Sequence, residues 1–116
     1  IMKVVIIGTR MLNDYYVFKK AIKESKIKIK EVITTDGNGT PLYAEIFARK
    51  NNLPLTVFKQ KLIKKKVDYK YKEMINLADT ALIIKAKNYP SEQINDFIKE
   101  TKNKKNFKYL IKEVKV

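Results

Sequence analysis

The sequence predicts an α/β domain: a single Rossmann-like three-layer domain whose parallel five-stranded sheet has the order 3-2-1-4-5, with helices on both faces. Two observations predict this fold. Short apolar runs such as 4–7 and 81–84 are typical of strands that are buried on both faces. Five extended segments alternate with four helical ones, and their connections are long enough for right-handed crossovers. With 116 residues and no linker or repeat, the chain is expected to be one domain over residues 1–116.

The first strand and helix are indicated by an apolar run and a helical repeat. The run covers residues 3–7 and stops at Gly8. Ile1 precedes Met2 and is expected to be an addition to the natural start. Asn13 or Asp14 is expected to cap a helix. After that cap, apolar residues recur at helical spacing, with lysines on the other side: Tyr15, Phe18 and Ile22.

A second β-rich run, residues 31–35, leads into the strongest turn signal of the chain, Asp36-Gly37-Asn38-Gly39. Thr40 or Gly39 is expected to cap the next helix, with Pro41 at the first helical position, which favours proline. The helix is predicted over 42–52. Pro54 then opens an extended segment, residues 55–58.

The second half begins with a basic stretch, residues 59–72, which we interpret as a surface loop leading into a helix. Residues 80–84 predict a buried strand, and Pro90 with Ser91 opens a further helix. Residues 107–114 predict a last strand. Its inward-facing side chains are expected to be Tyr109, Ile111 and Val114.

The composition excludes several functional classes. The chain has no cysteine and no histidine, which excludes disulfides, the usual zinc sites, cysteine nucleophiles and Ser-His-Asp triads. We expect no metal and no resident cofactor. No apolar run approaches the length of a membrane span, and the first residues lack the pattern of a signal peptide. A cytoplasmic protein without membrane association is therefore expected.

The charge of the chain favours anionic partners. It has 26 basic and 12 acidic residues, a net charge of +14. Such a balance is typical of proteins that bind nucleic acids, nucleotides or anionic surfaces. Only Arg10 and Arg49 are arginines, the residue type that binds phosphate bidentately. The lysine excess is equally typical of an AT-rich genome, so its functional use stays open.

The predicted topology places a candidate ligand site at one edge of the sheet. In open parallel sheets, ligands bind beyond the carboxyl ends of the strands, where the strand order reverses. At this edge Arg10 is expected to clamp an anion, and the glycine turn before a helix is expected to hold phosphate. The alternatives without a ligand are an ordinary glycine turn that joins strand to helix and an ion pair between Arg10 and Asp14. The predicted ligand-binding residues are Gly8, Thr9, Arg10, Asp36, Gly37, Asn38, Gly39 and Thr40.

Several segments resemble one family in the same order along the chain. The opening strand followed by Gly8-Thr9-Arg10 and Asn13-Asp14-Tyr15 is similar to the start of the YspA-like members of the SLOG superfamily. Residues 43–48 with 52–55, and residues 74–83, are similar to that family's later helices and strands. The resemblance covers about three quarters of the chain.

The resemblance implies a small Rossmann-like domain that binds nucleotides or nucleotide-derived ligands and that self-associates in many relatives. It is compatible with a sensor or sequestering protein of phage or mobile-element origin. The family's turn normally reads Gly-Gly-Ala-Arg-Gly-Ala-Asp, and here only Gly39 keeps its place. Its arginine corresponds to Asn38 and its aspartate to Pro41. These departures argue against an inherited catalytic activity.

Two alternative functions stay open. In ribose-cleaving relatives, a glutamate of this helix region works with an arginine to stabilise an oxocarbenium-like state. Glu45, a weak catalytic candidate, and Arg10 are therefore the candidates for cleavage of a nucleoside monophosphate. The bland alternative pairs Glu45 with Arg49 at i+4. The second function is single-stranded nucleic-acid binding through the lysines and tyrosines of the 59–72 face.

The basic stretch holds seven lysines and one aspartate, a net +6 within the +14 of the chain. We expect it chiefly to aid capture of a small anion, with weak and sequence-blind binding of DNA or RNA. The basic-surface residues are Lys64, Lys65, Lys66, Lys70 and Lys72. The apolar helix faces, together with Tyr43, Phe47 and Tyr89, also leave room for a homodimer or higher oligomer.

Overall fold

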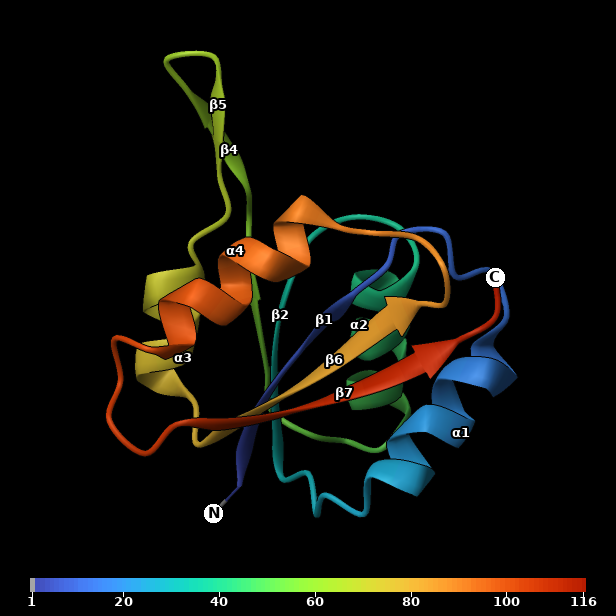
Figure 1. Cartoon of the computed structure of the whole chain (residues 1–116). Helices are drawn as coiled ribbons and strands as arrows, with labels where there is room; N and C mark the ends of the chain where they lie inside the picture. Colours follow the sequence, from blue (N-terminus) through green and yellow to red (C-terminus); the bar gives the residue numbers. More distant parts are fainter. Residues whose placement is uncertain (1) are drawn as a thin grey trace.

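A computed structural model describes residues 2–116 and contains the predicted parallel sheet (Figure 1). The five strands lie in the order β3-β2-β1-β6-β7, and each neighbouring pair is parallel. The α/β class and the parallel sheet are therefore confirmed. The order 3-2-1-4-5 holds when only the strands of this sheet are counted. Ile1 lies outside the described residues. The strands are β1 (Lys3–Gly8), β2 (Glu31–Thr35), β3 (Leu55–Phe58), β6 (Thr80–Ala86) and β7 (Lys108–Val114).

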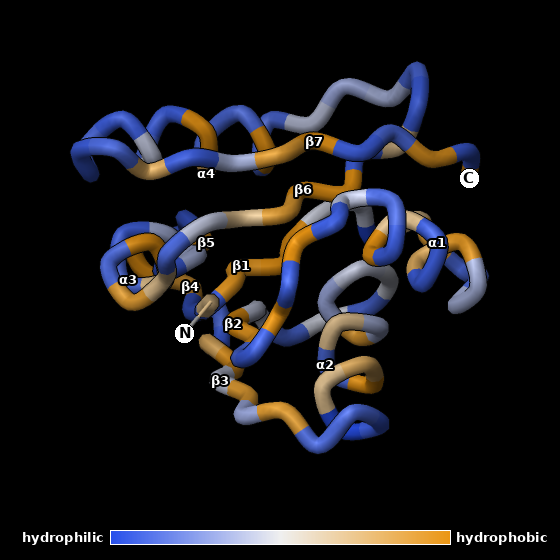
Figure 2. Tube along the Cα trace, turned by 90° about the horizontal axis from the view of Figure 1, so that it is seen from below, coloured by the Kyte–Doolittle hydropathy of each residue, from blue (hydrophilic) through white to orange (hydrophobic). Residues whose placement is uncertain are grey.

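The helices cover both faces of the sheet and complete a Rossmann-like arrangement of three layers. Helices α1 (Tyr15–Ser25) and α2 (Thr40–Lys50) lie on one face, and α3 (Tyr71–Leu77) and α4 (Glu92–Thr101) lie on the other (Figure 2). Among residues 2–116, no helix has both the length and the apolar character that a membrane crossing requires.

The apolar run of β1 is explained by the two cores that it separates. Alternate side chains of a strand point to opposite faces. Val4 and Ile6 pack in the core beneath α1 and α2. Val5 and Ile7 pack in the core beneath α3 and α4. A strand buried on both faces therefore reads as a continuous apolar run.

The predicted helix starts are confirmed for α1, α2 and α4, and polar side chains cap α1 and α4. The carboxylate of Asp14 accepts a hydrogen bond from the backbone N–H of Tyr16 at 2.9 Å, before α1. The hydroxyl of Ser91 accepts one from the N–H of Ile94 at 3.2 Å, before α4. Gly39 precedes α2, and Pro41 stands in its first turn.

The interpretation of residues 59–72 as a loop is wrong over most of its length. Two short strands, β4 (Lys61–Ile63) and β5 (Lys66–Asp68), pair antiparallel with each other. We call residues 61–68 the arm. It follows the carboxyl end of β3 and stands out from the body (Figure 1). The predicted following helix is α3.

The inward orientation predicted for two residues of the last strand is also wrong. Tyr109 and Ile111 are 39% and 38% exposed, whereas Val114 is buried. The reason is the position of β7, which pairs only with β6 and forms the edge of the sheet. An edge strand is covered less completely than the central strands.

Candidate ligand-binding site

The strand order reverses between β1 and β6. From β1 the chain builds outward through β2 to β3, and it then returns to the other side of β1 to form β6 and β7. Beyond the carboxyl ends of β1 and β6, the connections therefore diverge to opposite faces. Such a point is where open α/β sheets bind ligands.

A cavity of ≈190 Å³ lies at this point, between the end of β1 and the connection from β6 to α4. We call it the switch-point cavity. Of its ten lining residues, only Arg10 carries a charge. A cation without a neighbouring charge in the cavity favours an anionic ligand. The lining residues are Gly8, Thr9, Arg10, Met11, Ala86, Tyr89, Pro90, Ser91, Gln93 and Ile94.

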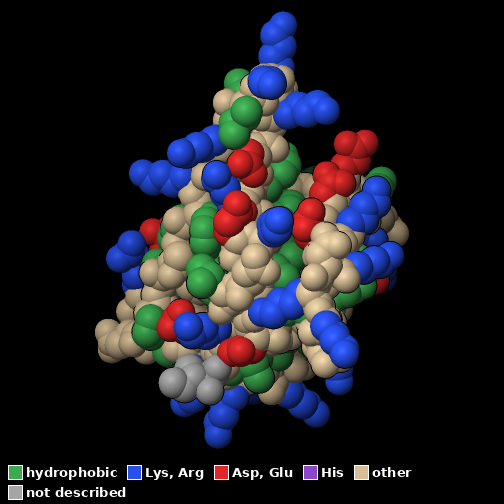
Figure 3. Space-filling view, turned by 90° about the vertical axis from the view of Figure 1, so that its left-hand side faces the viewer, with side chains coloured by type: hydrophobic (Ala, Val, Ile, Leu, Met, Phe, Trp, Pro, Cys, Tyr) green, Lys and Arg blue, Asp and Glu red, His purple; other side chains and the backbone are tan. Residues whose placement is uncertain are grey.

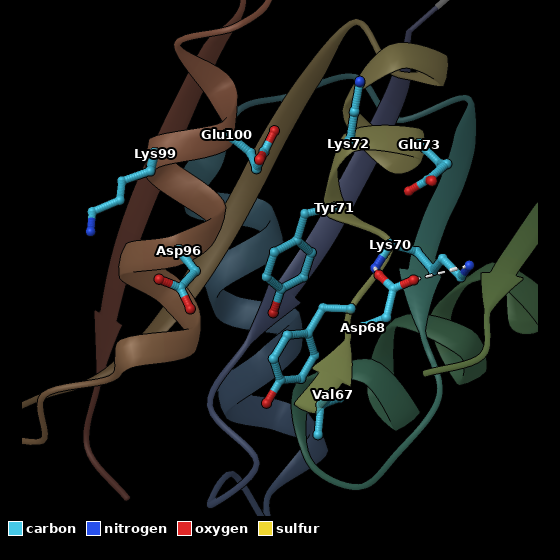
Figure 4. A pocket seen from close by; sticks show the side chains of 10 residues that line it. Val67, Asp68, Lys70, Tyr71, Lys72, Glu73, Asp96, Lys99 and Glu100 are labelled. Carbon is cyan, nitrogen blue, oxygen red and sulfur yellow. Dashed lines mark hydrogen bonds and ion pairs between the residues drawn. The ribbon is translucent and has the colours of Figure 1, made fainter. Parts of the chain in front are cut away.

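A second cavity, of ≈460 Å³, lies between the base of the arm and α4 (Figure 4). Four carboxylates and three lysines line it, so the carboxylates outnumber the cations. Its charge therefore disfavours a phosphorylated ligand, although its volume is larger. The charged residues are Asp68, Lys70, Lys72, Glu73, Asp96, Lys99 and Glu100.

Gly8 is required by the packing of the two central strands. A Cβ at this position would lie 2.0 Å from the carbonyl oxygen of Ile84 in β6. The next residue, Thr9, donates its N–H to the same oxygen at 2.8 Å. Only glycine allows backbones to approach so closely. The close approach of β6 thus fixes where the chain leaves β1 and where Arg10 stands.

The structure brings the glycine turn, residues 36–40, against Arg10. A Cβ on Gly37 would lie 1.7 Å from Nη1 of Arg10. One on Gly39 would lie 2.6 Å from the Cα of Arg10, and Gly39 has a φ of 71°. The guanidinium donates a long hydrogen bond of 3.4 Å to the carbonyl oxygen of Asp36. The backbone of the two glycines therefore packs closely against Arg10, where any side chain would collide.

The N-terminus of α2 is hydrogen-bonded to Thr9, which follows the end of β1. The backbone carbonyl of Thr9 accepts from the N–H of Thr40 at 3.0 Å and from its hydroxyl at 2.8 Å. Thr40 is fully buried, and the following Pro41 has no N–H to offer. This geometry gives the turn a positioning role. Direct contact of residues 36–40 with a ligand stays a prediction.

Asp36 faces the base of the arm. Its carboxylate accepts a hydrogen bond from the N–H of Gln60 at 3.1 Å, and the amide of Gln60 donates to the hydroxyl of Thr35 at 3.4 Å. Asn38 is exposed at the surface of the turn. The proposed ion pair of Arg10 with Asp14 does not form, because Asp14 caps α1. Within residues 2–116, Arg10 has no ion pair.

Tyr71, the first residue of α3, was not among the predicted site residues. It is 6% exposed, and within the described chain its hydroxyl has no hydrogen-bond partner. Its ring stacks on Tyr69 at 5.2 Å between centroids and meets Phe97 edge-on. Burial raises the pKa of this hydroxyl far above its ordinary value, against smaller lowering effects of the Gln93 amide and the Arg10 guanidinium. A buried hydroxyl without a partner is costly. Tyr71 lines the second cavity and not the switch-point cavity.

The lining residues missed from sequence include three polar ones in the connection to α4 and its first turn: Tyr89, Ser91 and Gln93. Tyr89 is 50% exposed. These residues could have been predicted from the sequence. Ser91 was predicted to cap a helix that follows a sheet strand, and the carboxyl ends of parallel strands lie at one edge of the sheet. The first N–H groups of a helix have no intrahelical acceptor, and the start of α4 contributes Ser91, Gln93 and Ile94 to the cavity lining.

Glu45 forms the ion pair with Arg49 that was the structural alternative to a catalytic role. Its Oε1 lies 3.0 Å from Nη2 of Arg49, one turn further along α2. The pair lies on the helix, and Glu45 does not line the switch-point cavity. No arrangement of the described residues joins Glu45 to Arg10.

The predicted basic residues occupy three different places. Lys64, Lys65 and Lys66 lie at the tip of the arm. Lys70 lies at the base of the arm and pairs with Asp68, at 3.1 Å. Hydrogen bonds from the backbone and side chain of Lys70 lower the pKa of Asp68. Lys72 is exposed on α3.

The candidate oligomer contacts also differ from one another. Tyr43 and Phe47 pack against Phe18, with ring centroids 6.0 and 6.2 Å apart. They therefore belong largely to the core, and only Tyr89 is half exposed. Self-association stays a prediction.

Comparisons of the chain with protein-family models, with curated proteins and with solved structures gave no significant match. The resemblance to the SLOG superfamily therefore stays a prediction that rests on the residues quoted for it.

Proposed function

We propose that this protein binds a nucleotide or a nucleotide-derived phosphorylated ligand in the switch-point cavity. The observation that carries the proposal is the position of Arg10, a guanidinium without an ion pair in the described chain, at the point where the strand order reverses. It is the one charged residue of the cavity, and Gly37 and Gly39 of the glycine turn pack against it. In this account, the protein acts as a sensor or a sequestering module.

The two sides of the cavity offer complementary donors to a phosphate. Arg10 follows the end of β1, and Ser91, Gln93 and Ile94 at the start of α4 line the same cavity. Backbone N–H groups at a helix start attract anions, and the helix dipole adds to this attraction. Glu92 lies in the same first turn but does not line the cavity.

The size of the cavity indicates which part of a ligand enters it. Sites that enclose a whole small molecule have volumes of roughly 300–1,000 Å³. At ≈190 Å³, this cavity is suited to a phosphate with part of a ribose. The base then lies outside, where the half-exposed ring of Tyr89 offers a stacking surface.

A thermal-shift screen against nucleoside mono-, di- and triphosphates tests the proposal. A ligand present at a hundredfold excess over its Kd stabilises the folded state by about 2.7 kcal/mol. We expect at least one phosphorylated compound to raise the unfolding temperature and its unphosphorylated nucleoside to have no effect. Equal stabilisation by the nucleoside and its phosphate would contradict a phosphate site.

Replacement of Glu45 separates binding from catalysis. We expect Glu45→Gln to leave ligand affinity unchanged, because the carboxylate pairs with Arg49 outside the cavity. The lost surface pair should lower the free energy of unfolding by about 0.3–0.5 kcal/mol. Calorimetric titration and thermal unfolding measure both quantities. Release of free base from a nucleoside monophosphate by the parent, lost in the variant, would establish the enzyme alternative.

A further inference from the structure

The arm projects from the body as an isolated two-stranded ribbon. Its strands pair only with each other, through Lys61 with Asp68, Leu62 with Val67 and Ile63 with Lys66. A two-stranded hairpin without a packed face is only marginally stable in water. A partner that covers the ribbon would therefore stabilise it.

Lysines occupy the two turn positions of the arm, where asparagine and glycine are favoured. Lys64 and Lys65 form a two-residue loop, and their φ values are 50° and 66°. Two successive positive φ values define a type I′ turn, which strongly prefers Asn-Gly. Lysine is disfavoured at both positions, because its Cβ crowds the backbone in this conformation. Strain of this kind points to a function for the side chains that carry it.

The charge of the arm is almost entirely positive. Its single acidic residue, Asp68, is already paired with Lys70 at the base. The four lysines 61, 64, 65 and 66 are exposed and have no ion pair among the described residues. Figure 3 shows basic side chains projecting from the arm in several directions. A strip of cations along a narrow ribbon is complementary to two rows of phosphates.

Apolar side chains of the arm are exposed between these lysines. Leu62 and Val67 form a cross-strand pair and are 72% and 43% exposed, and Ile63 is 49% exposed. In a groove of a nucleic-acid duplex, such side chains contact thymine methyl groups or sugars. The major groove of DNA is wide enough to admit a two-stranded ribbon.

The aromatic residues near the arm argue against a single strand as partner. Binding of single strands depends on exposed rings that stack on bases. Tyr69 and Tyr71 stack on each other, and Tyr71 is buried against Phe97. The arm itself, residues 61–68, has no aromatic residue.

We propose that the arm binds double-stranded DNA by lying in a groove, with its lysines on the phosphates and its apolar pair on the groove floor. Binding is independent of sequence and does not rest on the function proposed for the switch-point cavity. Nonspecific contacts of this size give Kd values of about 10⁻⁶ to 10⁻⁴ M at physiological salt.

The test is fluorescence anisotropy with a labelled 20-base-pair duplex and with one of its strands, over a range of salt concentrations. We expect tighter binding to the duplex. Replacing Lys64, Lys65 and Lys66 with Gln together should weaken duplex binding at least about tenfold and reduce the salt slope by about 2–3. The matched control replaces Lys102, Lys105 and Lys108, three exposed lysines at the opposite edge of the sheet, and should change affinity less than threefold.

The arm projects from the body, so the lysine variants should keep the unfolding temperature of the parent. Leu62→Ser provides a second variant, which leaves the charge unchanged. We expect Leu62→Ser to weaken duplex binding without altering the salt slope. Equal losses in the arm and control variants, or equal binding of duplex and single strand, would overturn the proposal. Binding of anionic phospholipid vesicles through the arm, without binding of the duplex, would also overturn it.

Discussion

Gly8→Ala is expected to lower the free energy of unfolding by about 3 kcal/mol or more, at or above the upper end of the usual range for overpacking. The added Cβ would lie 2.0 Å from the carbonyl oxygen of Ile84. That atom belongs to the backbone of the neighbouring central strand and cannot turn aside. The two strands would have to separate, and the hydrogen bond from Thr9 to Ile84 would lengthen. Urea unfolding followed by circular dichroism measures the loss.

Gly37→Ala provides the matched control. A Cβ there meets only the far end of the Arg10 side chain, which can move. Because Gly37 has a φ of 123°, we expect a loss of about 1–2 kcal/mol from backbone strain. Equal stability losses in the two variants would show that the close approach of β1 and β6 is not what requires Gly8.

Arg10→Ala is expected to weaken binding of a phosphorylated ligand by about 1–3 kcal/mol, which is a roughly 5- to 150-fold increase in Kd. The lost interaction is a charged hydrogen bond in a cavity that has no other cation. The fold should be retained, because Arg10 is exposed and donates only one long hydrogen bond. Isothermal titration calorimetry of parent and variant gives the change in affinity.

Arg49→Ala is the control for total charge, since it removes the same charge from α2 at a site outside the cavity. We expect its affinity to stay within about twofold of the parent, because exposed charges at a distance are screened by salt. A loss as large as that of Arg10→Ala would mean that net charge, rather than a specific contact, attracts the ligand.

The sheet and its helices were predictable because burial leaves a strong trace in the sequence. The runs in β1 and β6 are apolar without interruption since both faces of these strands are covered. Asp14 and Ser91 mark helix starts because a cap needs a short polar side chain. The edge strand β7 was predicted in place but not in orientation, because its apolar residues do not reveal that one side lacks a neighbour.

The arm was not predictable, because no residue of its strands is fully buried. Without a buried face there is no period of two in hydrophobicity. Its turn also lacks the glycine or asparagine that normally marks a hairpin. Lys64 and Lys65 therefore read as part of a charged loop, although they form a two-residue turn.

The candidate site was predictable only in part. The rule for strand ends brought Gly8, Thr9 and Arg10 to the correct edge, and the glycine turn does lie against them. Sequence alone did not show that Thr9 closes the start of α2 or that Gln93 faces Tyr71. These contacts join residues from different elements, and only the packing of the helices on the sheet determines them.

The most direct test of the central claim is to map the ligand site by NMR. A ¹⁵N-labelled sample is titrated with the nucleoside phosphate that stabilises the protein best, and the amide shifts are followed residue by residue. We predict that the largest changes cluster at residues 8–11 and 89–94, with smaller ones at Gly37 and Gly39. Changes confined to the arm, or spread evenly over exposed lysines, would contradict a ligand site at the switch point of the sheet.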